Sequence, residues 1–151
     1  MKNAERIYTD PSTLRALYVH ETRSAAVCRW RSRLAGALPV TSFGKAELLN
    51  AIALAAFRRD LTPVAAEASR QMFVEDLAEG RLCATDLLWR AAMDRCMEIS
   101  RRWTPTLGTR MLDALHVASA LEMGCTVLAS HDQRQLALAR ACGLKTLSPA
   151  T

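Results

Sequence analysis

The stretch from residue 108 to 136 constrains the fold more than any other part of the sequence, because helix, turn and strand signals follow one another there. Apolar residues at helical spacing predict the buried face of a helix: Leu112, Leu115, Ala118 and Leu121. Gly124 then suits a left-handed helix end. Residues 125–129 form a short apolar run with β-branched members, typical of a strand covered on both faces. The stretch therefore indicates a parallel α/β fold.

Two aspartates occupy notable places in this stretch. Asp113 lies in the first turns of the expected helix, and Asp132 follows the expected strand. Ligands of open parallel sheets bind outside the carboxyl ends of the strands. An aspartate at a helix start also has a simpler explanation, because negative charge is favourable there. Both interpretations stay open for each residue.

The rest of the chain alternates in the same way. Short strands are expected at 6–9, 38–41, 81–84 and 144–147. Helices are expected at 21–35, 43–59, 63–79, 87–103 and 133–141, with a shorter one from Pro11, and residues 104–108 are expected to form a loop. We expect Ser42, Thr62 and Asp86 to cap three of these helices. The alternation predicts a three-layer α/β/α sandwich around a short parallel sheet of four to five strands, in a single domain spanning residues 1–151.

Composition sets broad limits on the class of protein. The chain has 151 residues, half of them hydrophobic, which suits one core. No apolar run is long enough to cross a bilayer, and the first residues lack the apolar segment of a signal peptide, so we expect a cytoplasmic protein with no membrane partner. The five cysteines form no C-x-x-C pair, which favours reduced, buried thiols. The net charge of +5 is compatible with a nucleic acid partner.

Two further carboxylates attract attention. Asp10 follows the first expected strand and precedes Pro11, so it either caps a helix or places a carboxylate at the strand's carboxyl end. Glu47 lies beside the expected packed face of helix 43–59, which we assign to Ala46, Leu49, Ala53 and Phe57. A glutamate there is either a boundary residue with its head in water or a third carboxylate directed at a site.

Taken in order, these residues resemble a known family. Asp10-x-Ser12, Glu47, the segment Leu112-Asp113-Ala114-Leu115-His116-x-Ala118-x-Ala120, and Leu128-x-Ser130-x-Asp132 together resemble the PIN domain, and most of all the VapC-type toxins of toxin–antitoxin pairs. The resemblance covers nearly the whole chain. It implies a PIN-like α/β sandwich with Mg²⁺- or Mn²⁺-dependent endoribonuclease activity, an antitoxin partner and a homodimer.

The resemblance also implies a site. Its four acids match Asp10, Glu47, Asp113 and Asp132, which would be both catalytic and metal-binding, with Ser12 and Ser130 in support. Crowded carboxylates raise one another's pKa unless a cation offsets the repulsion, and oxygen ligands suit Mg²⁺ or Mn²⁺. Asp10 and Asp113 would ligate directly, Asp132 directly or through water, and Glu47 would hold a second ion or orient water.

Several basic residues near these acids keep two interpretations. His116 shares a helix face with Asp113, and is either a ligand or acid, or a core histidine with local hydrogen bonds. His131 either contacts RNA or is a turn residue. Arg110 either supports the site through phosphate or an acid, or faces water. The remaining arginine groups are phosphate-binding or plain surface charges: Arg58 and Arg59, Arg101 and Arg102, and Arg134.

Two rival functions remain. One is a non-catalytic PIN-like module that binds RNA or regulates. The other is a receiver-like phosphoacceptor domain, which needs a lysine near the acids late in the chain. Lys145 is the only lysine after Lys45, and no aspartate follows a central strand near the middle of the chain.

Overall fold

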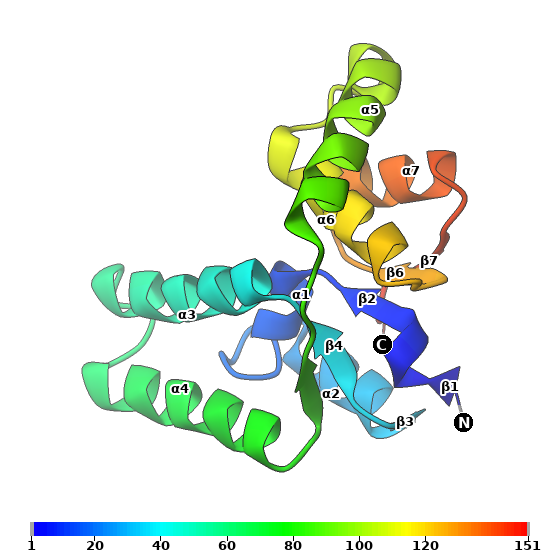
Figure 1. Cartoon of the computed structure of the whole chain (residues 1–151). Helices are drawn as coiled ribbons and strands as arrows, with labels where there is room; N and C mark the ends of the chain where they lie inside the picture. The colour runs from blue at the N-terminus through cyan, green and yellow to red at the C-terminus, as the bar shows by residue number, and fades with distance from the viewer. Residues whose placement is uncertain (1, 151) are drawn as a thin grey trace.

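Short parallel strands form the centre of the computed structural model, which describes residues 2–150 (Figure 1). They are β1 Lys2–Asn3, β2 Ile7–Thr9, β3 Leu34–Ala35, β4 Leu38–Val40, β5 Leu82–Ala84, β6 Val127–Ala129 and β7 Lys145–Leu147. One ladder has the order β2-β6-β7, a second pairs β4 with β5, and a third pairs β1 with β3. β4 packs beside β2. The expected sheet is therefore present as neighbouring three-stranded and two-stranded ladders.

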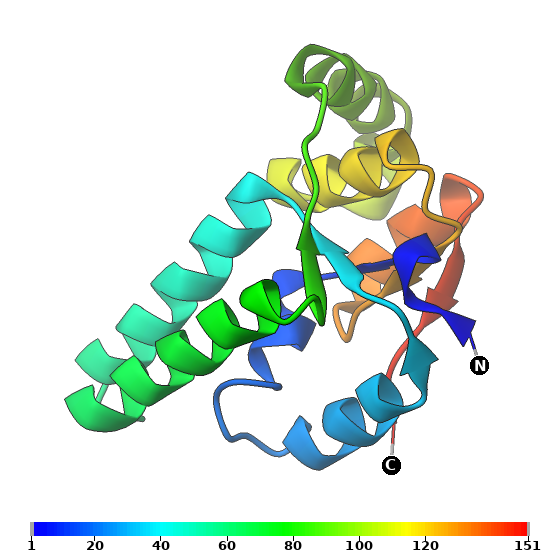
Figure 2. The ribbon, with the colours of Figure 1, turned by 60° about the horizontal axis from the view of Figure 1, so that its bottom comes forward.

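The helices are longer than the strands and account for most of the chain. They are α1 Pro11–Arg15, α2 Ser24–Ser32, α3 Ser42–Phe57, α4 Pro63–Ala78, α5 Trp89–Leu107, α6 Met111–Glu122 and α7 Gln133–Ala141, with a 3-10 turn, η1, at Ala4–Arg6. In Figures 1 and 2, α3 and α4 run side by side and project away from the strands, whereas α5, α6 and α7 gather at the other side.

Alternating side chains on the central strands create two cores. Tyr8 and Leu128 belong to a core shared with α5, α6 and α7. Ile7 and Ala129 face the other way, into a core shared with α1, α3 and α4. This is the period of two that a strand buried on both faces must show. It confirms the predicted α/β class with helices on both faces of a parallel sheet.

The predicted packed face of α3 is wrong. Leu48, Ile52 and Ala55 are the buried apolar residues, whereas Phe57 is 84% exposed. Ala46, Leu49 and Ala53 are exposed as well. The helix carries apolar residues around most of its circumference, so periodicity could not choose between two stripes. Contact with α4 and the strands selects one stripe and leaves the other at the surface.

The predicted face of α6 is only partly right. Leu115 and Ala118 are buried, but Leu112 is 49% exposed, and every residue from 113 to 120 is buried. The helix packs against both α5 and α7, so neighbours cover it on more than one side. That burial extends to Asp113, a charged residue.

The end of α5 also differs from the prediction. The helix does not stop at Trp103 but continues to Leu107, with Pro105 inside its last turn. Gly108 then ends it at φ 63°, and its N–H donates to the Thr104 carbonyl over 2.9 Å. A left-handed residue of this kind is a common helix end. The expected loop is therefore helical.

Helix starts and cysteines show smaller differences. Thr41, not Ser42, caps α3, and α5 begins at Trp89 with no side-chain cap from Asp86; Thr62 caps α4 as expected. α2 is shorter than expected, and β3 was not anticipated. All five cysteines are free, although Cys28 and Cys83 are exposed, not buried. Within residues 2–150, no helix has the length and apolarity needed to span a bilayer.

Candidate active site

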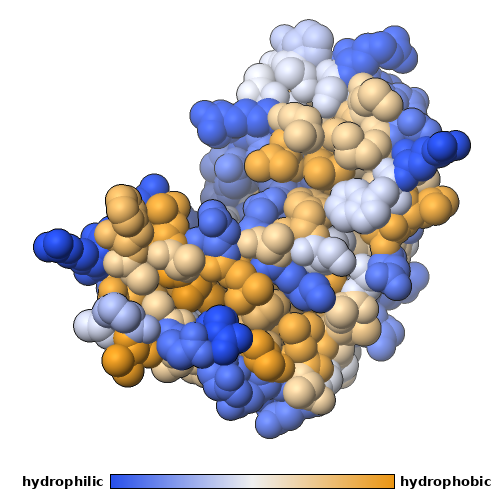
Figure 3. All heavy atoms as spheres, turned by 60° about the vertical axis from the view of Figure 1, so that its left-hand side comes forward, coloured by the Kyte–Doolittle hydropathy of each residue, from blue (hydrophilic) through white to orange (hydrophobic). Residues whose placement is uncertain are grey.

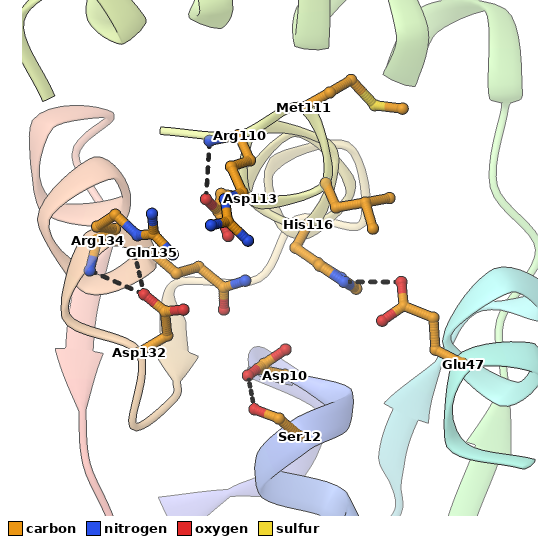
Figure 4. Close-up of a pocket in the computed structure, with 11 residues that line it drawn as sticks. Asp10, Ser12, Glu47, Arg110, Met111, Asp113, His116, Asp132, Arg134 and Gln135 are labelled. Carbon is orange, nitrogen blue, oxygen red and sulfur yellow. Dashed lines mark hydrogen bonds and ion pairs between the residues drawn. The ribbon is translucent and has the colours of Figure 1, made fainter. Parts of the chain in front are cut away.

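The four candidate acids line one pocket. Asp10, Glu47, Asp113 and Asp132 surround a cavity of about 420 Å³, together with Ser12, Arg110, His116, Arg134 and Gln135. Figure 4 shows the acids converging on this space from separate segments. Asp10 follows β2, Asp132 follows β6, and Glu47 lies in the helix that follows β4. The pocket therefore lies at the carboxyl edge of the strands, where parallel sheets bind ligands.

Asp10 enters the pocket from the junction between β2 and α1. It occupies the cap position of α1, but its side chain makes no capping hydrogen bond. Its Oδ2 instead accepts hydrogen bonds from the hydroxyls of Ser12 and, over 3.2 Å, Ser130. Only 6% of the residue is exposed, and burial raises the pKa of its carboxyl above the usual value. The hydroxyls oppose that rise without cancelling it.

Asp113 combines a helix-start role with a place in the pocket. Its Oδ2 accepts the backbone N–H of Arg110, the residue that precedes α6, over 2.9 Å. The residue is 9% exposed, and the exposed part lies in the pocket. A role at the helix start therefore accounts for Oδ2 of Asp113 but not for its other carboxylate oxygen.

Asp132 is the cap of α7. Its Oδ1 accepts the backbone N–H groups of Arg134 and Gln135 over 2.9 and 3.1 Å. Its own N–H donates to Ser130 Oγ over 3.0 Å. Ser130 thus connects the two acids that follow adjacent strands, since its hydroxyl also donates to Asp10.

Glu47 reaches the pocket from α3 and meets His116. The Nε2 atom of His116 lies 3.1 Å from Glu47 Oε1. On its other side, His116 Nδ1 lies 2.6 Å from the hydroxyl of Tyr8, and the histidine is only 3% exposed. His116 is therefore a core histidine with local hydrogen bonds, and one of its partners is a candidate site residue.

The carboxylate oxygens divide into two sets. One oxygen of each acid is held by the protein: Oδ2 of Asp10, Oδ2 of Asp113, Oδ1 of Asp132 and Oε1 of Glu47. The second oxygen of Asp113, Asp132 and Glu47 takes no hydrogen bond from residues 2–150. These three acids are thus anchored through one oxygen, and the other is free to bind a ligand in the pocket.

Gln135 adds an acceptor that the sequence had not pointed to. It is 3% exposed, lines the pocket, and its Oε1 is buried with no hydrogen-bond partner among the described residues. A buried acceptor without a donor costs free energy, so we expect a group in the pocket to donate a hydrogen bond to this atom. The available signal was its spacing, because Gln135 follows Asp132 by three residues in one helical turn.

The donor set suits a hydrated hard cation. Free carboxylate oxygens are ligands that Mg²⁺ and Mn²⁺ accept, and coordinated water could donate to Gln135. No group of three or more His, Cys, Asp or Glu side chains within residues 2–150 is gathered closely enough to hold a metal ion directly. Mg²⁺ commonly keeps several waters and takes only one or two carboxylates, so the wider spacing fits water-mediated ligation.

The two arginines next to the acids line the pocket, and His131 does not. Arg110 and Arg134 line the pocket and are exposed, so they form a cationic rim beside the acids. His131 does not line the pocket; its ring nitrogens contact the Thr13 hydroxyl at 3.2 Å and the Pro149 carbonyl at 2.8 Å. It therefore links α1 to the C-terminal segment, as a turn residue would.

Comparison with known proteins gives one line of similarity, in structure. No protein-family model matches the chain, and no curated protein resembles it significantly in sequence. A crystal structure of FitAcB from Neisseria gonorrhoeae is similar, with a TM-score of 0.63 over 95% of this chain and 97% of that chain. The sequences are 18% identical, so the similarity establishes a shared fold.

Proposed function

We propose that this protein is a Mg²⁺- or Mn²⁺-dependent endoribonuclease of the PIN type, the toxin of a toxin–antitoxin pair in the cytoplasm. The observation that carries the proposal is the pocket that gathers Asp10, Glu47, Asp113 and Asp132 from four separate segments. The similarity to FitAcB supports the α/β fold on which the proposal rests, and the toxin role comes from the resemblance of the sequence motifs to VapC-type toxins.

The hydrogen bonds that hold each acid indicate the role it would have. Asp10 and Asp113 are nearly buried and fixed through one oxygen, so they suit direct ligation. Asp132, held by the start of α7, would ligate directly or through water, and Glu47 would hold a second ion or orient water. A bound divalent cation would lower the pKa of an attacking water and neutralise charge on the scissile phosphate.

The protein's own groups would place the RNA. The guanidinium groups of Arg110 and Arg134 stand at the pocket rim, where they can pair with phosphate oxygens of the RNA. Ser12 and Ser130 hold the Asp10 carboxylate in place. The aromatic content is 5%, so base stacking offers little and contacts to the RNA backbone should dominate.

An apolar surface on α3 and α4 supports a protein partner. Leu49, Leu54, Phe57 and Val64 are exposed, with Phe57 at 84% and Val64 at 80%. Figure 3 shows apolar side chains gathered on this side of the molecule. A groove of about 380 Å³ between the two helices is lined by Ala53, Ala56, Pro63 and Ala66, among others. Contiguous exposed apolar surface marks an interaction site, here for an antitoxin or a second copy.

Cleavage of a mixed tRNA and rRNA pool tests the proposal. We expect discrete cuts with Mg²⁺ or Mn²⁺, none with EDTA, and none with Asp10→Asn or Asp113→Asn. The matched control is Asp94→Asn, because Asp94 is an exposed acid of α5 that does not line the pocket. Cuts that persist in both site variants would contradict the assignment. Loss of activity on co-expression with the product of the adjacent reading frame would support the antitoxin.

A second function has one observation in its favour. The acids are not gathered into a ready cation site within residues 2–150, which would also suit a PIN-like module that binds RNA without cutting it. The same assay separates the two functions. RNA binding at the pocket with no cleavage under any metal condition would favour the binding module.

A further inference from the structure

A hydrogen-bond chain runs from the protein core to the candidate site. The Tyr8 hydroxyl lies 2.6 Å from His116 Nδ1, and His116 Nε2 lies 3.1 Å from Glu47 Oε1. The three residues come from β2, α6 and α3. Figure 4 shows the imidazole of His116 extending from α6 toward the carboxylate of Glu47. The chain therefore ties one candidate acid to two separate elements of the fold.

The first two members of this chain have little freedom. Tyr8 and His116 are 2% and 3% exposed. The Phe43 ring packs against the imidazole with 4.8 Å between centroids, and the Tyr8 ring lies 5.8 Å away. An imidazole enclosed between two aromatic rings and hydrogen-bonded at both nitrogens has one orientation. Glu47, by contrast, has a flexible side chain that is 35% exposed.

The direction of the hydrogen bonds follows from the end groups. A carboxylate only accepts, so His116 Nε2 must carry the proton and donate to Glu47. In the neutral ring, Nδ1 is then an acceptor, and it accepts a hydrogen bond from the Tyr8 hydroxyl. Burial raises the pKa of Tyr8 well above its ordinary value, so the phenol keeps that proton.

We infer that His116 is a positioning residue that holds Glu47 toward the pocket through Nε2–H, with Tyr8 fixing the proton on that nitrogen. This inference rests on the proposed function, since it gives Glu47 its orientation for a cation or water. It also excludes His116 as a cation ligand, because Nδ1 is used by Tyr8 and Nε2 carries a proton. With Oε1 held, Oε2 of Glu47 is the atom left for the site.

A pair of amide variants tests the role of the Nε2 donor. Gln at position 116 places an N–H group near the position of Nε2, and can donate to Glu47. Asn is one methylene shorter, and its amide reaches only the level of Nδ1. Loss of partners that orient a ligand typically lowers metal affinity or activity by about 10- to 100-fold. We expect His116→Asn to lose about that much in kcat and in Mn²⁺ affinity measured by calorimetry, with KM for RNA unchanged.

The difference between the two variants separates a hydrogen-bonding role of Nε2 from a purely structural role of the ring. His116→Gln should exceed His116→Asn by about tenfold in both quantities, which a purely structural role for the ring would not produce. Equal loss in both variants, with thermal unfolding like wild type, would overturn the inference. Full activity of both variants would overturn it as well. An inactive wild type that binds no Mn²⁺ would instead contradict the proposed function.

Imidazole nitrogen NMR tests the proton position without any activity. At pH 8, we expect His116 to show the Nε2–H tautomer, because Nε2 donates to Glu47. Tyr8→Phe keeps the aromatic ring and removes the hydroxyl, and should give a mixture of tautomers. A proton on Nδ1 in the wild-type protein would overturn the inference even if the amide variants failed to fold.

Discussion

Replacing Asp10 by Asn should stabilise the metal-free protein while removing its proposed activity. Asp10 is 6% exposed, and burial raises the pKa of its carboxyl, so the folded state holds an ionised group that it disfavours at neutral pH. Asn has nearly the same shape and keeps a polar group beside the hydroxyls of Ser12 and Ser130. The substitution therefore removes the buried charge without opening a cavity.

Two opposing effects set the size of the gain. Burial destabilises the carboxylate, whereas the two hydroxyls stabilise it, and burial is the larger effect. The net gain is what remains after both effects, and a single stabilising substitution commonly gives about 0.5–2 kcal/mol. For a domain of this size, each kcal/mol corresponds to about 2–4 °C in Tm. We therefore expect the Tm of Asp10→Asn to rise by a few degrees.

The gain should depend on pH in a definite direction. Below the ordinary aspartate value of 3.8, Asp10 is protonated in both the folded and the unfolded protein, so the variant has no advantage. As pH rises from there to the folded pKa, the folded wild type binds more protons than the unfolded chain and loses stability. Asn does not titrate. The advantage should therefore grow above pH 3.8 and become constant once the folded carboxyl is ionised.

Urea unfolding in EDTA at several pH values between about 3 and 8 measures this difference, if the low-pH transition stays two-state. Asp94→Asn, an exposed acid outside the pocket, is the control and should show little change at any pH. A variant less stable than wild type at pH 7 would refute the reasoning, as would an advantage of the same size at pH 3. Added Mn²⁺ should raise the Tm of wild type more than that of Asp10→Asn, because ligand binding to the folded state stabilises it.

Three other predictions concern the fold and its surface. Asp132→Ala should cost about 1 kcal/mol in urea unfolding through loss of the α7 cap, whereas Asp132→Asn keeps an oxygen for the cap and should be nearly neutral. Leu128→Ala removes a fully buried side chain from the core beneath α6 and should cost about 2–5 kcal/mol in the same measurement. Phe57→Ser should change stability by less than about 0.5 kcal/mol but weaken binding of the co-expressed partner, measured by calorimetry.

The order of elements could be predicted from the sequence because local signals are strong in this chain. Gly124 has a positive φ and follows a helix, and Pro11 and Pro63 both stand at helix starts. The strand at β6 follows from its β-branched and apolar residues. These features depend on neighbours along the chain, so they can be predicted without knowledge of the tertiary fold.

The buried face of α3 could not be predicted, because the choice depends on distant elements. Leu48 and Leu49 are adjacent and equally apolar, yet the first is fully buried and the second is exposed. Only the position of α4 and the strands decides between them. Pro105 suggested that the helix ends before it, but a proline in the last turn disturbs little of the helix that precedes it, and α5 continues to Leu107.

The sequence pointed to the four acids that line the pocket and to Ser12 and Ser130 beside Asp10, but not to the contacts of His116 or to Gln135. Asp10 and Asp132 follow strands and Asp113 lies in the first turn of a helix, positions that are visible in the sequence, whereas Glu47 lies in the second turn of α3. The contact between Tyr8 and His116 joins residues 108 positions apart, so no local pattern reveals it. Gln135 was missed because a glutamine in a polar helix turn usually faces water, and only the packing of α7 buries it.

Calorimetric titration with Mn²⁺ tests the central claim most directly, because the proposed activity requires that carboxylates of the pocket hold a cation. Wild type and Asp94→Asn should each show saturable binding, and Asp113→Asn should lose it while its unfolding transition stays cooperative. Unchanged Mn²⁺ binding by Asp113→Asn, or no binding by wild type, would contradict the account.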